Sequence, residues 1–372
     1  MVMAMKGHNG FSPCRMCKIT GLRPPDTRGT THYIPLHRAR HPDIAANPTA
    51  VKCYDSANLP MRTHQEFLQQ GQKVQQARND AEFERLSREC GIKGVPVIST
   101  LASISLPWSF PYDFMHLIFE NMIPNLVLLW TGDFKGLDCG REQYQLQPSV
   151  WDAIGAATAA SGPSLPYAFC SRPVNVANHE KHRMTADSWS FWFQYIAPVV
   201  LESRFSHPKF YKHFVDFVKL VRLCLKFDLT QQDISDIRLG FQSWVSKYEE
   251  VVTLYYETYI DLYARRKAKR PALVAKTFFG QLQHIFVVRL PLDERLGIPD
   301  GKVHIIVAIE PCKITRTNPS LDIHWYKTFE RVIYLDVICI QCLVGRVRAP
   351  DGGWGIVDRS GDLARAIYAI ED

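Results

Sequence analysis

The chain has 372 residues, of which 46% are hydrophobic and 12% aromatic, and 44 Lys and Arg against 37 Asp and Glu give a net charge of +7. This apolar content excludes wholesale disorder and low-complexity fibres, and the length suits roughly two or three folded units. The longest apolar runs fall far short of the ~20 residues that cross a bilayer, so we expect no membrane span. Residues 1–10 lack the apolar core of a secretory signal, which predicts an intracellular protein whose ten cysteines are reduced thiols.

The first 147 residues are predicted to combine an irregular segment with two helices. Residues 1–60 are rich in Gly, Pro, His and Arg and show no helical period, which predicts an irregular or metal-organised segment. Sparse apolar positions from Thr63 to Cys90 predict a mostly solvated helix that stops at Gly91. A second helix is expected over residues 112–130, kinked or split by Pro124.

The centre of the chain has an almost wholly helical pattern, and the C-terminal part changes to a strand pattern. Helices are predicted over residues 186–205 and 207–227, and Thr230 to Asp233 resembles a capping box that opens a third helix toward Tyr263. After a basic run, β-rich runs separated by turns predict five or six antiparallel strands in a small barrel or sandwich. The fold class is therefore α+β, with expected domains at 1–147, 148–271 and 272–372.

Two pairs of cysteines have the CxxC spacing. Cys14 and Cys17 lie in a polar turn, with His8 before them and His32, His37 and His41 after them. Such a turn can present two thiolates to one Zn²⁺, but no second pair at a standard spacing follows, so a redox-inert turn is the alternative. Cys339 and Cys342 lie inside an apolar run, where alternation along a strand would point them to opposite faces, so they are predicted to be buried strand cysteines.

Asp113, His116 and Glu120 are spaced so that all three can project from one face of a helix. Such a cluster could bind a divalent metal or carry out proton transfer, which would make the chain a metal-dependent hydrolase. The simpler interpretation is that Asp113 binds His116 and anchors or caps the start of the helix.

A basic run places five charges in six positions, at Arg265, Arg266, Lys267, Lys269 and Arg270. This run could contact phosphates or act as a nuclear-import signal, and a solvated linker is equally compatible with it. The sequence contains neither a nucleotide-binding glycine loop nor a nucleophile elbow.

Several segments together resemble the transposase-like proteins of CACTA-type (En/Spm-like) DNA transposons that are abundant in fungal genomes. The segments are residues 6–17, 91–96, 110–117 and 125–132, with further similarity at 279–282 and 357–361. The resemblance implies part of an RNase H-like core with a large helical insertion, in which three acidic residues hold two divalent ions for DNA strand cleavage and transfer. It also implies that Cys14 and Cys17 are half of a zinc site and that Asp113 and His116 match an Asp-x-x-His signature within the insertion.

This sequence departs from the family pattern at the catalytic acids. The first two acids should precede the CxxC motif, yet no Asp or Glu precedes Cys14. The segment with a His pair and the last Glu should follow the long helices, but the sequence passes instead to the basic run. We therefore expect a truncated, transposon-derived protein that is catalytically inactive. It would use Mg²⁺ only if a complete homologue supplied the acids.

We expect the protein to retain salt-sensitive binding to DNA, or binding to a protein such as a full-length transposase. We expect it in the nucleus, or in the cytoplasm if the basic run is not an import signal. The alternative is a co-opted nuclear protein-interaction module, with an aromatic groove around Trp189, Trp192 and Phe193. Salt dependence separates the two, because phosphate contacts weaken steeply with ionic strength.

Overall fold

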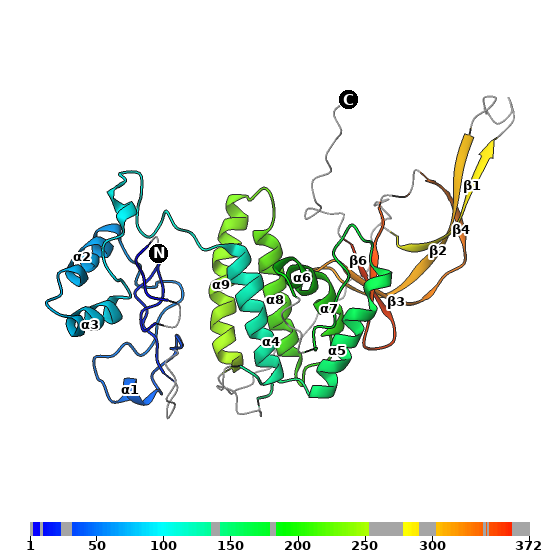
Figure 1. The fold of residues 1–372 in the computed structure, drawn as a ribbon. Helices are drawn as coiled ribbons and strands as arrows, with labels where there is room; N and C mark the ends of the chain where they lie inside the picture. The colour runs from blue at the N-terminus through cyan, green and yellow to red at the C-terminus, as the bar shows by residue number, and fades with distance from the viewer. Residues whose placement is uncertain are drawn as a thin grey trace, which may run out of the picture. The chain divides into compact units, whose positions relative to one another are not determined.

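The computed structural model describes residues 3–7, 10–23, 32–134, 142–178, 184–252, 278–289, 303–337, 340 and 342–358. Helices and a six-stranded antiparallel sheet make the chain a mixed α+β protein, as predicted (Figure 1). The chain forms two compact units. The first comprises Met1–Ile118, Phe134–Cys139 and Arg238–Leu254, and the second comprises Phe119–Asp133, Gly140–Ile237 and Tyr255–Asp372.

The first unit begins with irregular chain, which confirms the expectation for residues 1–60 as far as they are described. Its order comes from isolated β-bridges, which pair Met5 with Ile92, Cys17 with Met61, Leu22 with Tyr33 and His37 with Cys53. The single short helix described there is α1 (Pro42–Ala45). Bridges between distant residues therefore hold this segment in place of regular elements.

The helix predicted over residues 63–90 is two helices, α2 (His64–Gln75) and α3 (Asp80–Cys90). The Asn79 side chain caps α3, and Gly91 ends it with a left-handed φ of 77°, as the sequence predicted. As expected, most residues of the pair are exposed or partly exposed, and a few side chains such as the fully buried Phe67 of α2 face inward. Phe67 packs in a core with Met3, Met5, Ile92 and Leu106. A short 3₁₀ turn, η1 (Val97–Thr100), follows.

The predicted break at Pro124 is confirmed. A π-helix, η2 (Met115–Met122), precedes α4 (Ile123–Thr131), and Pro124 lies in the first turn of α4, where its missing N–H needs no partner. Gly132 ends α4 in the left-handed conformation.

The helices of the second unit are α5 (Pro148–Ala160), η3 (Gly162–Ser164), α6 (Ala186–Phe191), η5 (Trp192–Ile196), α7 (Ala197–Val200) and α8 (Pro208–Cys224). The first residues of α9 (Gln231–Val252) belong to this unit, and the rest belong to the first. The predicted capping box is present, since Thr230 and Asp233 exchange backbone-to-side-chain hydrogen bonds of 2.9 and 3.1 Å. The predicted extension of α9 toward Tyr263 lies outside the described residues.

The proposed aromatic groove around Trp189, Trp192 and Phe193 is wrong. These side chains are only 6%, 2% and 0% exposed, because they form the core between the helices. Phe193 meets the ring of Phe214 edge-on at 5.5 Å, and the Trp192 indole N–H donates to the hydroxyl of Thr158. Aromatic residues at helical spacing here fill a core and present no surface for a partner.

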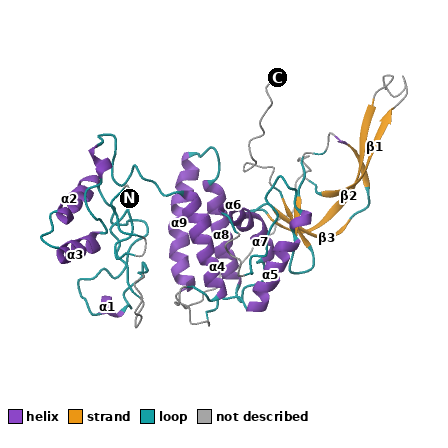
Figure 2. Cartoon of the chain, viewed as in Figure 1, coloured by secondary structure: helices purple, strands orange, loops and turns teal. Residues whose placement is uncertain are grey.

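The sheet consists of β1 (Gly280–Arg289), β2 (Val303–Asn318), β3 (Ile323–Phe329), β4 (Ile333–Asp336), β5 (Gly345–Arg348) and β6 (Trp354–Val357). Its order is β1-β2-β3-β6-β5, with β4 paired to β2, and all these pairs are antiparallel. Figure 2 shows the strands in orange and the helices in purple. Strands β1 and β5 end this path without pairing to each other. The strands that the structure describes therefore form an open sheet and no closed barrel.

The prediction of a buried strand around Cys342 is wrong. Cys342 is exposed in the irregular chain between β4 and β5, and Cys339 lies outside the described residues. Alternating apolar residues predicted a strand here, but the described residues 340 and 342–344 are not in a strand. The basic residues Arg265 to Arg270 also lie outside the described residues. Among the described helices, none is both long and apolar enough to span a membrane.

Candidate functional site

The turn Cys14–Cys17 is held by backbone pairing with the chain just before α2. Cys17 bridges Met61, the Arg62 N–H donates to the carbonyl of Met16 at 2.9 Å, and the Lys18 N–H donates to the carbonyl of Pro60 at 2.8 Å. Because these bonds join residues about 45 positions apart, the shape of the turn depends on the tertiary fold.

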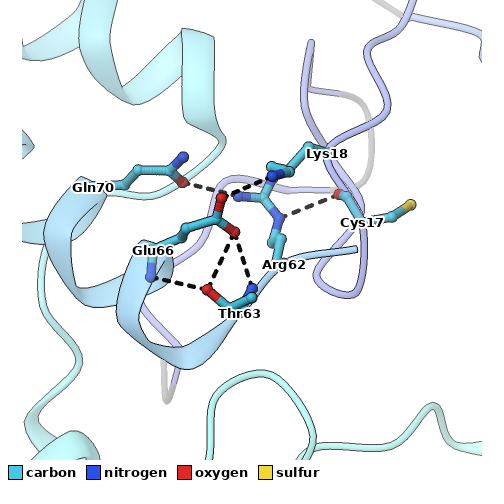
Figure 3. A network of polar contacts seen from close by, with 6 residues as sticks. All are labelled: Cys17, Lys18, Arg62, Thr63, Glu66 and Gln70. Carbon is cyan, nitrogen blue, oxygen red and sulfur yellow. Dashed lines mark hydrogen bonds and ion pairs between the residues drawn. The ribbon is translucent and has the colours of Figure 1, made fainter. Parts of the chain in front are cut away.

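Arg62 anchors the same turn from inside the unit. Its side chain is buried, and its Nε donates to the carbonyl oxygens of Cys14 at 3.1 Å and Cys17 at 3.2 Å. The remaining guanidinium nitrogens donate to the carbonyl of Cys90 at 2.8 Å and to the Gln70 amide oxygen at 3.2 Å (Figure 3). Burial lowers the pKa of Arg62. One planar guanidinium thus ties the turn to α2 and α3, which the single ammonium of Lys could not do.

Glu66 joins the turn to the first residues of α2. Its carboxylate accepts from the Thr63 N–H at 3.1 Å and from the Lys18 ammonium at 2.9 Å, while the Thr63 hydroxyl accepts from the Glu66 N–H (Figure 3). These reciprocal bonds form a capping box at the start of α2. The Lys18 hydrogen bond lowers the pKa of Glu66.

The two sulfurs of the turn are in direct contact. Cys14 Sγ lies 3.1 Å from Cys17 Sγ and accepts from the Cys17 N–H at 3.3 Å, and the Tyr112 hydroxyl lies 3.3 Å from it. The Cys17 thiol hydrogen bond lowers the pKa of Cys14 to about 5, and the same bond raises the pKa of Cys17, whose proton it holds. Burial raises the pKa of Tyr112. The turn therefore pairs a partly exposed sulfur, whose pKa is lowered, with a buried thiol.

The two sulfurs of the turn lie closer together than the two thiolates of a tetrahedral zinc site would. Two thiolates at about 2.3 Å from a tetrahedral zinc lie roughly 3.8 Å apart, so the observed pair would have to separate. No group of three or more His, Cys, Asp or Glu side chains suited to a metal occurs among the described residues. The described residues thus supply two candidate ligands and do not complete a zinc site, and the zinc prediction stays a prediction.

The neighbouring histidines go elsewhere in the fold. His37 Nδ1 lies 3.2 Å from Cys53 Sγ, across the bridge between their two segments. His41 Nε2 lies 2.7 Å from the carbonyl oxygen of Arg23, and His32 meets the ring of Phe11 edge-on. His8 lies outside the described residues. These contacts organise the loops of residues 10–60.

The structure brings Asp113 and His116 together and leaves them exposed. The His116 Nδ1 lies 2.9 Å from the Asp113 carboxylate, which also accepts from the His116 backbone N–H at 3.1 Å. The His116 hydrogen bond lowers the pKa of Asp113. This geometry fits the simpler interpretation, in which Asp113 caps the start of η2. Glu120 follows within η2, and the three do not form a metal-binding group of the described residues.

Sequence reasoning missed Arg62 and Tyr112. Tyr112 adjoins the Asp-x-x-His motif, and the Arg15 guanidinium lies over its ring at 4.1 Å, so the resemblance to a family already pointed to its segment. Arg62 had no local signal, because its four acceptors lie 8 to 48 residues away along the chain.

No protein-family model, curated protein or solved structure matches this chain.

Proposed function

We propose that this chain is a transposon-derived, nuclear DNA-binding protein that has no strand-transfer chemistry of its own. The observation that carries the proposal is the positive charge of residues 1–62. This segment holds nine Lys and Arg against three Asp, a net charge of +6 in a chain whose total is +7. The charge is therefore concentrated in one sixth of the chain.

Three exposed cations of this segment lie on loops that the fold joins together. They are Arg23, Arg40 and Lys52, named here the basic loop surface. The carbonyl of Arg23 contacts the ring of His41, next to Arg40, and the carbonyl of Lys52 accepts from the Arg38 N–H at 3.0 Å. The buried guanidinium of Arg38 holds this arrangement, since it donates to the carbonyl of Thr20 at 2.8 Å. Their backbones are thus fixed, while the three charged side chains reach solvent.

Exposed cations on fixed loops suit the phosphate backbone of nucleic acid. Each phosphate contact releases a condensed counterion, so affinity falls steeply with salt and carries no base information. Three contacts give a logarithmic salt slope of about −2.7, which is roughly a 40-fold loss of affinity between 50 and 200 mM salt.

The resemblance to CACTA-type transposases supports the origin and the absence of catalysis. Two-metal strand transfer needs several carboxylates at one place to hold the ions. Within the residues given, no Asp or Glu matches the acids that the family places before its CxxC motif, so this stretch of sequence does not supply them. We expect no Mg²⁺- or Mn²⁺-dependent cleavage of terminal-repeat DNA, and robust cleavage would refute this part of the proposal.

The test of DNA binding is fluorescence anisotropy of a labelled duplex, titrated with the full chain at several salt concentrations. The triple variant Arg23→Ala, Arg40→Ala, Lys52→Ala should flatten the salt slope by about two to three units. The control variant Lys73→Ala, Lys313→Ala, Arg331→Ala removes the same charge from exposed positions elsewhere and should leave the slope nearly unchanged. Equal losses in both variants would show a general charge effect and refute the assignment to the basic loop surface.

A second candidate function is protein interaction, and the exposed edge of the sheet favours it. Among the described strands β1 pairs only with β2, and its Ile285 and Val287 side chains are 59% and 70% exposed. Residues 280–288 of β1 contain no Pro and no acidic or basic residue except His284, so nothing in them repels an identical strand. The partner that fits this edge is a second copy of the chain, paired antiparallel through β1.

Size-exclusion chromatography with light scattering, which measures the molar mass of the protein in solution, tests this candidate. The candidate would be supported by a dimer that becomes monomeric in the double variant Ile285→Lys, Val287→Lys. The dimer should persist in the control double variant Lys313→Ala, Arg331→Ala. A monomer at every concentration would remove it.

A further inference from the structure

We propose that Cys14 and Cys17 form a reversible dithiol–disulfide switch that reacts with low-molecular-weight disulfides. The inference is independent of the proposed function, because it concerns the sulfur chemistry of the turn and no DNA contact. It also gives the thiol pair a use that needs no further ligand from the described residues.

The distance between the sulfurs carries the proposal. At 3.1 Å the two Sγ atoms are about 1 Å from the length of a disulfide bond, which is about 2.05 Å. Two intervening residues join them, and the backbone of that turn is fixed by Arg62 through the carbonyls of Cys14 and Cys17. The oxidised pair therefore needs a small adjustment of the side chains and no rearrangement of the segment.

The exposure of the two sulfurs gives each a separate role. Cys14 is partly exposed, whereas Cys17 is only 2% exposed. Cys14 also accepts two hydrogen bonds from Cys17, one from its thiol and one from its backbone N–H, which favour negative charge on the outer sulfur. A disulfide arriving from solvent meets Cys14 first, and Cys17 is positioned to react only with the sulfur of Cys14.

The reaction balances as a two-step exchange. The Cys14 thiolate attacks one sulfur of a small disulfide, forms a mixed disulfide and releases the first thiolate, which takes up a proton from solvent. Cys17 then loses its proton and attacks Cys14 Sγ, so that the internal disulfide forms and the second small thiol leaves. The protein dithiol is oxidised by two electrons, and the small disulfide is reduced to two thiols.

The fold connects this chemistry to the segment before η2. The Tyr112 hydroxyl lies 3.3 Å from Cys14 Sγ, and Arg15 both stacks on the Tyr112 ring and donates to the Pro111 carbonyl at 2.7 Å. A disulfide sulfur is a weaker hydrogen-bond partner than a thiolate, so oxidation weakens the contact between Cys14 Sγ and the Tyr112 hydroxyl. The redox state of the pair would then change the order of residues 110–116, where Asp113 begins η2.

The test equilibrates the full chain, freed of metal by a chelator, with glutathione buffers of increasing oxidised fraction. Free thiols are then trapped with an alkylating agent, and peptide mass mapping follows each cysteine. We expect the Cys14–Cys17 disulfide to increase with the oxidised fraction, while the exposed thiols Cys53 and Cys342 form only mixed disulfides. Absence of the internal disulfide in fully oxidised buffer would overturn the proposal.

Two variants separate the roles of the sulfurs. In Cys17→Ser the mixed disulfide should accumulate on Cys14, and in Cys14→Ser the buried Cys17 should remain unmodified. Cys17→Ala replaces the serine variant if circular dichroism shows that serine perturbs the fold. Equal modification of Cys17 in Cys14→Ser would contradict the assigned order of attack.

Two further measurements cover transmission and zinc. Limited proteolysis within residues 110–116 should increase on oxidation of the wild type and stay constant in Cys14→Ser, which lacks the sulfur that contacts Tyr112. No change in the wild type would overturn the link to Tyr112. In a second arm, Zn²⁺ alone is added to the reduced chain and measured with a chromophoric chelator. One tightly bound zinc that protects both thiols from oxidised glutathione would overturn the switch and identify the pair as metal ligands.

Discussion

Replacement of Arg62 tests how the Cys14–Cys17 turn is held. Arg62→Met keeps much of the buried volume but removes the bonds to the carbonyls of Cys14, Cys17 and Cys90 and to the Gln70 amide. Hydrogen bonds from a charged donor contribute about 1.5–3 kcal/mol each, and bonds that share one guanidinium are not additive. We therefore expect a loss of about 3–5 kcal/mol in the free energy of unfolding of the first unit.

Arg62→Lys should lower the free energy of unfolding of the first unit by about 2 kcal/mol. One ammonium keeps the charge but cannot reach all the acceptors of the planar guanidinium. Arg40→Ala is the matched control: Arg40 is exposed, and its removal should change stability by less than about 0.5 kcal/mol.

Hydrogen exchange of the full chain, read by mass spectrometry, measures the effect locally. In Arg62→Met the peptides that cover residues 10–23 and 60–93 should lose protection, whereas those of α8 should not. Unchanged protection in Arg62→Met, or equal behaviour of Arg62→Met and Arg62→Lys, would refute the view that the guanidinium geometry holds the turn.

Three further predictions concern packing and caps. Phe193→Ala should lower the free energy of unfolding, measured with a chemical denaturant, by about 3–5 kcal/mol because it leaves a cavity beside Phe214. Phe227→Ala is the control and should have little effect, since the Phe227 side chain is 78% exposed. Equal losses in the two variants would contradict the burial of Phe193. Gly91→Ala should lower the free energy of unfolding by at least about 2 kcal/mol, because φ is 77° and the added Cβ would collide with the Ser12 carbonyl. Gly7→Ala is the control, since a Cβ at Gly7 meets no neighbouring atom. Similar melting temperatures of the two variants would refute the strain at Gly91. Hydrogen bonds from Thr230 and Lys226 lower the pKa of Asp233 to about 2, so its stabilisation of α9 is complete above the usual aspartate pKa near 4 and is lost as the pH falls toward 2. Helix content in an acid titration should show this loss in the wild type and not in Asp233→Asn. Identical titration curves would refute the claim that the ionised Asp233 stabilises α9.

The sequence alone predicted the features that depend on neighbouring residues. Gly91 ends α3 because glycine, which has no Cβ, adopts the left-handed conformation without a steric penalty. Pro124 lies in the first turn of α4, where the π-helix changes to an α-helix, and Thr230 with Asp233 caps α9. The strand pattern near residues 286, 305, 334 and 355 likewise predicted strands of the observed sheet, and the mixed α+β class followed from these local signals.

The tertiary structure decided what those elements pack against. The Trp189 and Trp192 spacing is the same on an open groove and in a core, and only the packing of α5, α6 and α8 around them shows that they are buried. Alternation near Cys342 resembles a strand, but a strand needs a neighbouring ladder, and the described residues 342–344 are not in a strand. The contact between Cys14 and Cys17, visible in the sequence only as a spacing, takes its geometry from Arg62 and Tyr112. Those residues lie 45 or more positions away along the chain, and long-range hydrogen bonds of this kind leave no periodic pattern in a sequence.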